Sequence, residues 1–217
     1  MIKNQAEIFQ PENQTIVYVD GFNLYFGLKS KGWSRYYWLD LNKLSQNLLK
    51  CHQRLSSIKY FTSRIESTIY DPYKHKRQQT YIEALQTIDL CSIYFGHYLR
   101  KAIKCNRCGN TWESFEEKMT DVNIGIEMLD DAYCSRFDTA ILISGDSDLA
   151  GPLKKIKKLF PSKRIVVAFP PNRVSKQLKQ ISDAYFTIGR KAFSESQFPD
   201  QVKNNAGFTL LRPTKWV

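Results

Sequence analysis

Short apolar runs alternate with longer amphipathic stretches along most of the chain. The run at residues 16–19 is rich in β-branched residues and stops at Asp20-Gly21, which predicts a buried strand. Similar runs predict further strands at residues 57–62, 92–98, 138–144, 164–169 and 185–188. Strands that are apolar on both faces and alternate with helices predict an α/β fold, in which helices cover both faces of a mainly parallel sheet.

The intervening stretches carry apolar residues at helical spacing. Asp40 is positioned to cap a helix in which Leu41, Leu44 and Leu48 share one face. The same reasoning predicts helices at residues 22–29, 41–50, 71–89 and 116–133, and one that begins near residue 149. Residues 101–112 show no regular spacing of apolar side chains, which predicts an irregular loop. The last 28 or so residues lack strong periodicity, and we expect a tail or strap there.

Two predicted strands end at carboxylates. Asp20 ends the first strand, and Asp146 and Asp148 follow the strand at residues 138–144. In parallel sheets, ligands bind outside the carboxyl ends of the strands, so neighbouring strands would bring these acids together. Turn formation and helix capping explain a single Asp at such a position equally well. Crowded carboxylates, however, favour Mg²⁺ or Mn²⁺, and Asp121 could add a further oxygen from its helix.

Three sequence blocks resemble the signature blocks of the NYN domain family, also called LabA-like. They are VDGFNLY at residues 19–25, EEKMTDVNIGIEML at 116–129 and ISGDSDLAGPLK at 143–154. The resemblance covers residues 15 to 190 and implies a three-layer α/β/α fold similar to PIN and FLAP nucleases. It also implies a metal-dependent ribonuclease site, with Asp20, Asp121, Asp146 and Asp148 as metal ligands and Asn23 beside them. Relatives often carry Asp at the position of Glu127, so we leave Glu127 out of the predicted site.

The charge balance indicates a polyanionic partner. The 217 residues carry 32 Lys and Arg against 21 Asp and Glu, a net charge of +11. Residues 151–180 contain nine of these basic residues and no acid. A Lys-rich helix face is commonly just solvated, but this one directly follows Asp148. We therefore expect an RNA backbone to contact Lys154, Lys155, Lys157 and Lys158. The resemblance to the NYN family, whose pattern places a Lys three residues before the Asp at position 121, adds Lys118 to this set.

The five cysteines include one Cys-x-x-Cys pair, Cys105 and Cys108. A structural Zn²⁺ needs four ligands, and the chain has no second pair. His97, Cys91 or Cys134 could complete the site, as could the same pair from another subunit in a homodimer. A pair of reduced thiols without metal is the alternative. The first 14 residues lack the features of a signal peptide, and no apolar run is long enough to cross a bilayer, so we expect a cytoplasmic protein without membrane contact.

Together these features predict a Mg²⁺- or Mn²⁺-dependent endoribonuclease that cleaves single-stranded RNA. An RNA-binding or adaptor protein with a vestigial acidic site is the alternative, and a nucleotide phosphohydrolase using the same ions is a third hypothesis. The expected organisation is an N-terminal extension at residues 1–14, the NYN domain at 15–190 with a Cys-x-x-Cys loop near 101–112, and a tail at 191–217.

Overall fold

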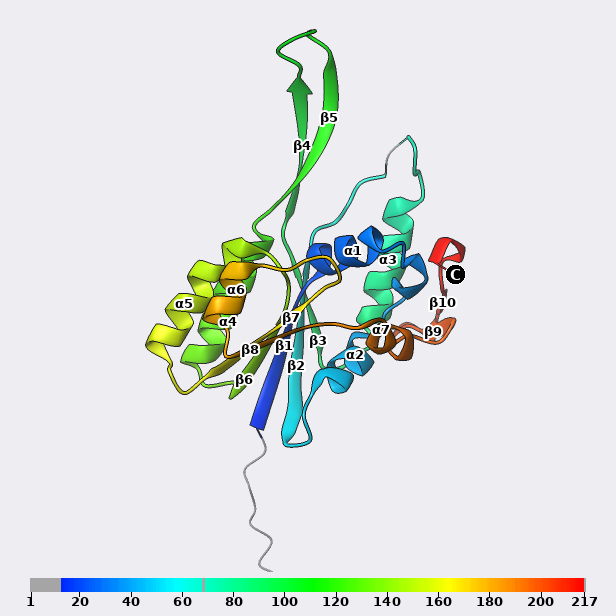
Figure 1. The fold of residues 1–217 in the computed structure, drawn as a ribbon. Helices are drawn as coiled ribbons and strands as arrows, with labels where there is room; N and C mark the ends of the chain where they lie inside the picture. Colours follow the sequence, from blue (N-terminus) through cyan, green and yellow to red (C-terminus); the bar gives the residue numbers. More distant parts are fainter. Residues whose placement is uncertain (1–12, 68, 217) are drawn as a thin grey trace, which may run out of the picture.

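Six parallel strands form the central sheet of the computed structural model, which describes residues 13–67 and 69–216, apart from the side chains of 98–101 and 112–117 (Figure 1). The first 12 residues of the predicted N-terminal extension lie outside this description. The strand order is β3-β2-β1-β6-β7-β8. Counted among the sheet strands alone, this is the doubly wound order 3-2-1-4-5-6, whose winding reverses between β1 and β6. The strands are β1 Asn13–Asp20, β2 Gln53–Thr62, β3 Cys91–Phe95, β6 Thr139–Ile143, β7 Arg164–Phe169 and β8 Ala184–Thr187.

Helices cover both faces of the sheet, which confirms the predicted three-layer α/β/α fold. One face carries α1 Gly21–Ser30, α2 Leu41–Leu48, α3 Lys74–Leu85 and α7 Arg190–Glu195. The other carries α4 Thr120–Tyr133, α5 Ala150–Leu159 and α6 Lys176–Ile181. Three 3-10 turns complete the helical elements: η1 Ser34–Tyr36, η2 Ser147–Leu149 and η3 Thr214–Trp216. No helix within the described part of the chain is long and apolar enough to cross a membrane.

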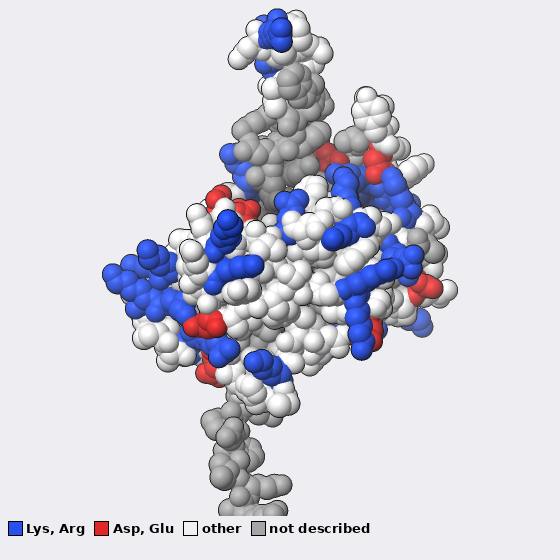
Figure 2. All heavy atoms as spheres, viewed as in Figure 1, with Lys and Arg blue, Asp and Glu red and all other residues white. Residues whose placement is uncertain are grey.

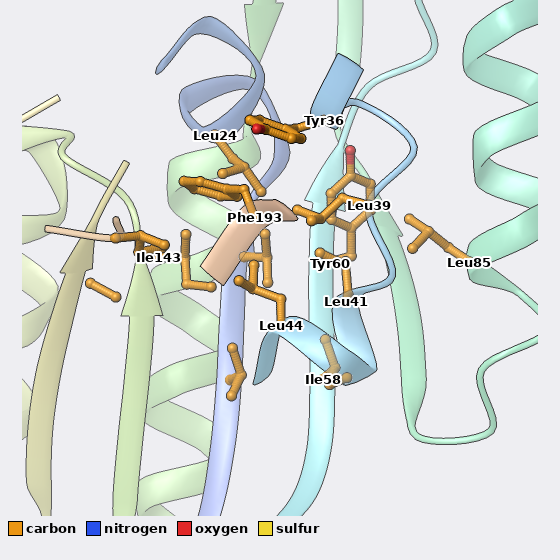
Figure 3. Close-up of a cluster of buried hydrophobic side chains, with 14 of the residues drawn as sticks. Leu24, Tyr36, Leu39, Leu41, Leu44, Ile58, Tyr60, Leu85, Ile143 and Phe193 are labelled. Atoms are coloured by element: carbon orange, nitrogen blue, oxygen red, sulfur yellow. The ribbon is translucent and has the colours of Figure 1, made fainter. Parts of the chain in front are cut away.

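The alternation of side chains along β1 divides the core into two clusters. Val17 and Val19 face the cluster under α1 and α2, whereas Ile16 and Tyr18 face the cluster under α4 and α5. This is the two-sided burial expected of a central parallel strand. Figure 3 shows the first cluster, where Leu24, Leu41 and Phe193 converge from three different helices. Asp40 caps α2 as predicted, because its carboxylate accepts hydrogen bonds from the backbone N–H groups of residues 42 and 43 at 2.9 and 3.1 Å.

The segment beyond residue 190 packs against the same core. Phe193, Phe198 and Leu210 are buried in the first cluster, and Trp216 contacts it. The Trp38 indole N–H donates to the carbonyl oxygen of Pro199 at 2.8 Å. A short antiparallel pair, β9 Gln201–Lys203 and β10 Thr209–Leu211, continues this segment. These residues therefore contribute apolar contacts to the face of the sheet that carries α1 and α2.

Two local predictions are wrong at residues 96–119. The predicted irregular loop and the predicted first turn of the helix at 116 are the arms of a hairpin, β4 His97–Lys104 and β5 Thr111–Lys118. The predicted strand at 92–98 divides at Gly96, where a side chain would meet the carbonyl oxygen of Lys118 at 2.7 Å. Met119 separates β5 from α4 with a left-handed φ of 76°. The hairpin forms a two-stranded sheet separate from the central one, and its sequence lacks the apolar run that identified the other strands.

Candidate metal centre

The candidate site lies where β1 and β6 end at the carboxyl edge of the sheet. The two strands pair in parallel up to Val19 and Ile143, so Asp20 and Ser144 follow as neighbours. The Ser144 hydroxyl donates to the Asp20 carboxylate at 2.8 Å. Asp20 also caps α1 by accepting from the Asn23 N–H at 2.9 Å. The expectation that these two strands are neighbours is confirmed.

Hydrogen bonds from backbone N–H groups to side-chain oxygens hold the loop that follows β6. The Gly145 N–H donates to the Asn23 side-chain oxygen at 2.9 Å, and the Asp146 N–H donates to the Ser144 hydroxyl at 3.0 Å. Asp146 in turn accepts from the Asp148 N–H at 3.0 Å and caps η2. Each acid of this loop therefore has a fixed backbone position relative to Asp20 and Asn23.

Three carboxylates meet in front of this loop. Asp121 lies in the first turn of α4, and its oxygen lies with those of Asp146 and Asp148 in a group whose members are all within 4.8 Å of one another. Oxygen ligands on opposite sides of a Mg²⁺ ion are about 4 Å apart, so this donor set fits a hard divalent cation. Burial, followed by the charges of Asp146 and Asp148, raises the pKa of Asp121 to about 6. Without a cation the three charges repel one another, and a cation would relieve that repulsion.

The other acids of the prediction are placed differently. Asp20 is buried, and its carboxylate accepts hydrogen bonds from the Asn23 N–H and the Ser144 hydroxyl, so it is linked to the cluster through the loop. Glu127 lies away from this group and forms an ion pair with Lys59 at 2.7 Å. Ser144 was missed by sequence reasoning, although it stands directly before the Gly145-Asp146 pair that was identified.

The predicted basic residues lie on α5 and at the end of β5. Lys154, Lys155 and Lys158 are exposed, and Figure 2 shows basic side chains gathered over the α5 region. Lys157 instead forms an ion pair with Asp183. Lys118 is exposed at the end of β5, three residues before Asp121. Because η2 connects the acidic loop directly to α5, the exposed lysines begin within two turns of the carboxylates.

An aromatic cavity of about 130 Å³ lies on the other side of α1. Phe22 lines it, while the next residue, Asn23, contacts the acidic loop. The remaining lining includes the rings of Tyr25, Tyr37, Tyr81 and Trp216, with the cations of Lys74 and Arg77. Sequence reasoning missed this cavity because Trp216 and Tyr25 are far apart in the chain. Burial, and then the charge of Lys29, lowers the pKa of Lys74, while Arg77 at the same end of the cavity forms an ion pair with Asp71.

Comparisons with known proteins agree with this architecture. The sequence profile of the NYN domain matches residues 14–208. The crystal structure of VPA0982, a protein of unknown function from Vibrio parahaemolyticus, superposes with a TM-score of 0.54 at 17% identity, covering 86% of this chain and 97% of that one. The 6-hydroxy-3-succinoylpyridine 3-monooxygenase HspA of Pseudomonas putida is 27% identical over 66% of this chain and 55% of its own length. The chain therefore spans about half the length of this curated relative.

Proposed function

The chain belongs to the NYN domain family, a PIN-like nuclease-type family, and on that premise we propose that it is a divalent-cation-dependent endoribonuclease acting on single-stranded RNA. The single observation that carries the proposal is the group formed by Asp121, Asp146 and Asp148 at the winding reversal of the sheet. Three clustered carboxylates offer the oxygen ligands that Mg²⁺ and Mn²⁺ prefer. A cation bound there would neutralise charge on a phosphodiester and increase the acidity of a water molecule.

The remaining residues of the site act by positioning. Asp20 and Asn23 hold the loop that carries Asp146, because their side chains accept from Ser144 and Gly145. The buried position of Asp20 suits this role, and its negative charge adds to the field that attracts the cation. Removing the Asp20 charge is therefore expected to reduce both cation affinity and the order of the loop.

The basic surface would hold the substrate. An RNA strand that contacts Lys154, Lys155 and Lys158 on α5 passes the acidic loop, because η2 joins the two. Contacts to phosphate are independent of sequence and weaken as salt concentration rises. The proposal therefore includes a strong salt dependence of RNA binding and little base preference from α5 itself.

The test compares Asp146→Asn with Asp89→Asn, a control at an exposed position away from the acidic loop. Purified proteins are incubated with single-stranded RNA and Mn²⁺, and cleavage and binding are measured separately. We expect Asp146→Asn to lose cleavage by at least about 100-fold and to keep RNA binding, while Asp89→Asn behaves as wild type. Equal cleavage by wild type and Asp146→Asn would point to a contaminating nuclease and refute the proposal. Tight RNA binding without any cleavage by wild type would favour the adaptor function.

A second candidate function rests on the aromatic cavity. The relative HspA is named for an oxygenation of a substituted pyridine that bears a succinoyl carboxylate. The aromatic walls offer stacking to such a ring, and Lys74 at one end of the cavity offers charge pairing to its acid group. The test supplies 6-hydroxy-3-succinoylpyridine, O₂ and a reductant, and looks for a hydroxylated product by mass spectrometry. Product formation that survives Asp146→Asn would support this function and separate it from RNA cleavage.

A further inference from the structure

The hairpin of β4 and β5 extends away from the central sheet, and a Cys-x-x-Cys pair lies at its tip (Figure 1). The last ladder pair joins Lys104 to Thr111, so Cys105 and Cys108 both lie in the six-residue turn between them. The two arms form a separate two-stranded sheet. A two-stranded hairpin is at best marginally stable in water, so an arm of this length gains order from a second interaction at its end.

The turn arranges both sulfur atoms for one ligand. The Cys105 N–H donates to the Asn110 carbonyl oxygen at 2.8 Å, and the Gly109 N–H donates to the Cys105 carbonyl oxygen at 2.9 Å. Gly109 adopts a left-handed φ of 72°, which a glycine allows at no steric cost. Backbone N–H groups of Cys108 and Arg107 hydrogen bond to the Cys105 sulfur, as does the Cys108 thiol. The turn therefore holds the two sulfur atoms next to each other.

Two sulfur ligands are half of a structural zinc site, which requires four. All three histidines and five cysteines belong to the described residues. In that part of the chain, the acidic triad is the sole group of three or more His, Cys, Asp or Glu side chains close enough to share an ion. His97 begins β4, seven residues before Lys104, and is therefore about 23 Å from the tip at about 3.3 Å per residue. Of the other residues proposed to complete the site, Cys91 lies on β3 in the central sheet and Cys134 follows α4.

We propose that Cys105 and Cys108 bind one Zn²⁺ together with the same two cysteines of a second copy of this chain. Two identical tips related by a two-fold axis present four sulfur atoms, which is the tetrahedral set that structural zinc takes. On binding, each thiol that is still protonated releases its proton, and four Zn–S bonds form with no change in oxidation state. The site is incomplete without the second copy, and it exists whether or not the chain cleaves RNA.

The charge at the tip of the hairpin supports a second copy of the chain as the partner. A zinc ion with four thiolates carries a net charge of −2, and Lys104 and Arg107 lie exposed beside the ligands in each copy. Figure 2 shows basic side chains at the end of the hairpin. The four cations of the two tips are attracted to this negative site and more than offset its charge, whereas two metal-free tips would repel each other. The metal and the dimer are therefore expected to form and dissociate together.

The experiment uses the full chain purified under reducing conditions with Zn²⁺ present. Zinc content is measured by plasma mass spectrometry, and molar mass by light scattering after size exclusion. We expect one zinc per two chains and a dimer that a strong chelator converts to monomer. Cys105→Ser and Cys108→Ser should lose both zinc and dimer, while the controls Cys51→Ser and Cys134→Ser, which change exposed thiols elsewhere, should keep both.

Several results would overturn the proposal. They are one zinc per monomer, a zinc-free protein with a Cys105–Cys108 disulfide or free thiols, and a dimer that persists in Cys105→Ser. Far-ultraviolet circular dichroism separates loss of metal from loss of fold, because the hairpin lies outside the central sheet. Replacement of zinc by Co²⁺ adds an independent measurement, since four thiolates give a tetrahedral cobalt spectrum that two thiolates and water do not.

Discussion

Replacing Asp121 by Asn is expected to stabilise the protein in the absence of metal and to abolish its stabilisation by Mn²⁺. Burial and the charges of Asp146 and Asp148 raise the pKa of this carboxyl from 3.8 to about 6. A group whose pKa is higher in the folded protein favours folding below its unfolded value, and that contribution is lost as the pH rises through about 6. At pH 7.5 the ionised Asp121 therefore lowers the stability of the metal-free fold.

The size of this effect follows from the same values. One pKa unit corresponds to about 1.4 kcal/mol, so the difference between 3.8 and about 6 sets an upper bound of about 3 kcal/mol. Asp121 is only half-buried, and solvent screening reduces the expected gain to about 1–2 kcal/mol. For a chain of this length, a gain of that size raises Tm by about 2–8 °C.

The assay is thermal unfolding in chelator and in Mn²⁺, at pH 7.5 and at pH 5. With chelator, Asp121→Asn should melt above wild type at pH 7.5, and the difference should shrink at pH 5, where the wild-type carboxyl is largely protonated. With Mn²⁺, the wild type should gain stability by mass action and the variant should not. A variant that melts at or below wild type in chelator at pH 7.5 would contradict the charge repulsion that defines the site.

Three further predictions concern other parts of the molecule. Gly145→Ala should reduce RNA cleavage by more than about 10-fold with the fold retained, because the added Cβ would lie 2.4 Å from the Arg173 carbonyl oxygen. The control is Gly151→Ala, whose added Cβ would meet no atom within 4 Å, and this variant should cleave RNA normally. Lys59→Met should lower the free energy of unfolding in urea by about 1–3 kcal/mol, because it removes the 2.6 Å ion pair to the fully buried Asp131, which keeps its contacts to Arg136 and the Tyr18 hydroxyl. Adding Asp131→Asn should restore part of that loss. The third change replaces the exposed Lys154, Lys155 and Lys158 by Ala. It should lower RNA affinity and reduce the slope of log affinity against log salt concentration by about 2, as measured by fluorescence anisotropy.

The central sheet could be predicted from the sequence because its strands are apolar on both faces. The run at residues 164–169 coincides with β7, and the runs around Val17 and Ile141 mark β1 and β6, which pair with each other. The general rule that ligands bind at the carboxyl ends of parallel strands then pointed to Asp20 and Asp146. That rule does not give the direction of each side chain. In the structure the Asp20 carboxylate accepts from the Ser144 hydroxyl, while Asp121, Asp146 and Asp148 form the group of three.

The hairpin could not be predicted in the same way, because it is not part of the central sheet. Its arms mix polar and apolar residues without the two-residue apolar period, and the acids near residue 117 resemble a helix start. The aromatic cavity was missed for a different reason. It joins Tyr25 and Tyr37 to Trp216 across nearly the whole chain, and no local pattern records such contacts.

The position of Asp121 depends on the root of the hairpin more than on α4 itself. Met119, at the N-cap of α4, makes no side-chain cap hydrogen bond, so the helix start is not fixed by the usual local device. Instead β5 ends at Lys118, whose carbonyl oxygen lies so close to Gly96 that only a glycine fits there. The left-handed turn at Met119 then directs the chain into α4, and Asp121 follows two residues later. The hairpin therefore joins the cysteine pair at its tip to the acidic cluster at its root through one continuous ladder, so the proposed zinc-bridged partner would lie at the far end of the strand that leads to Asp121.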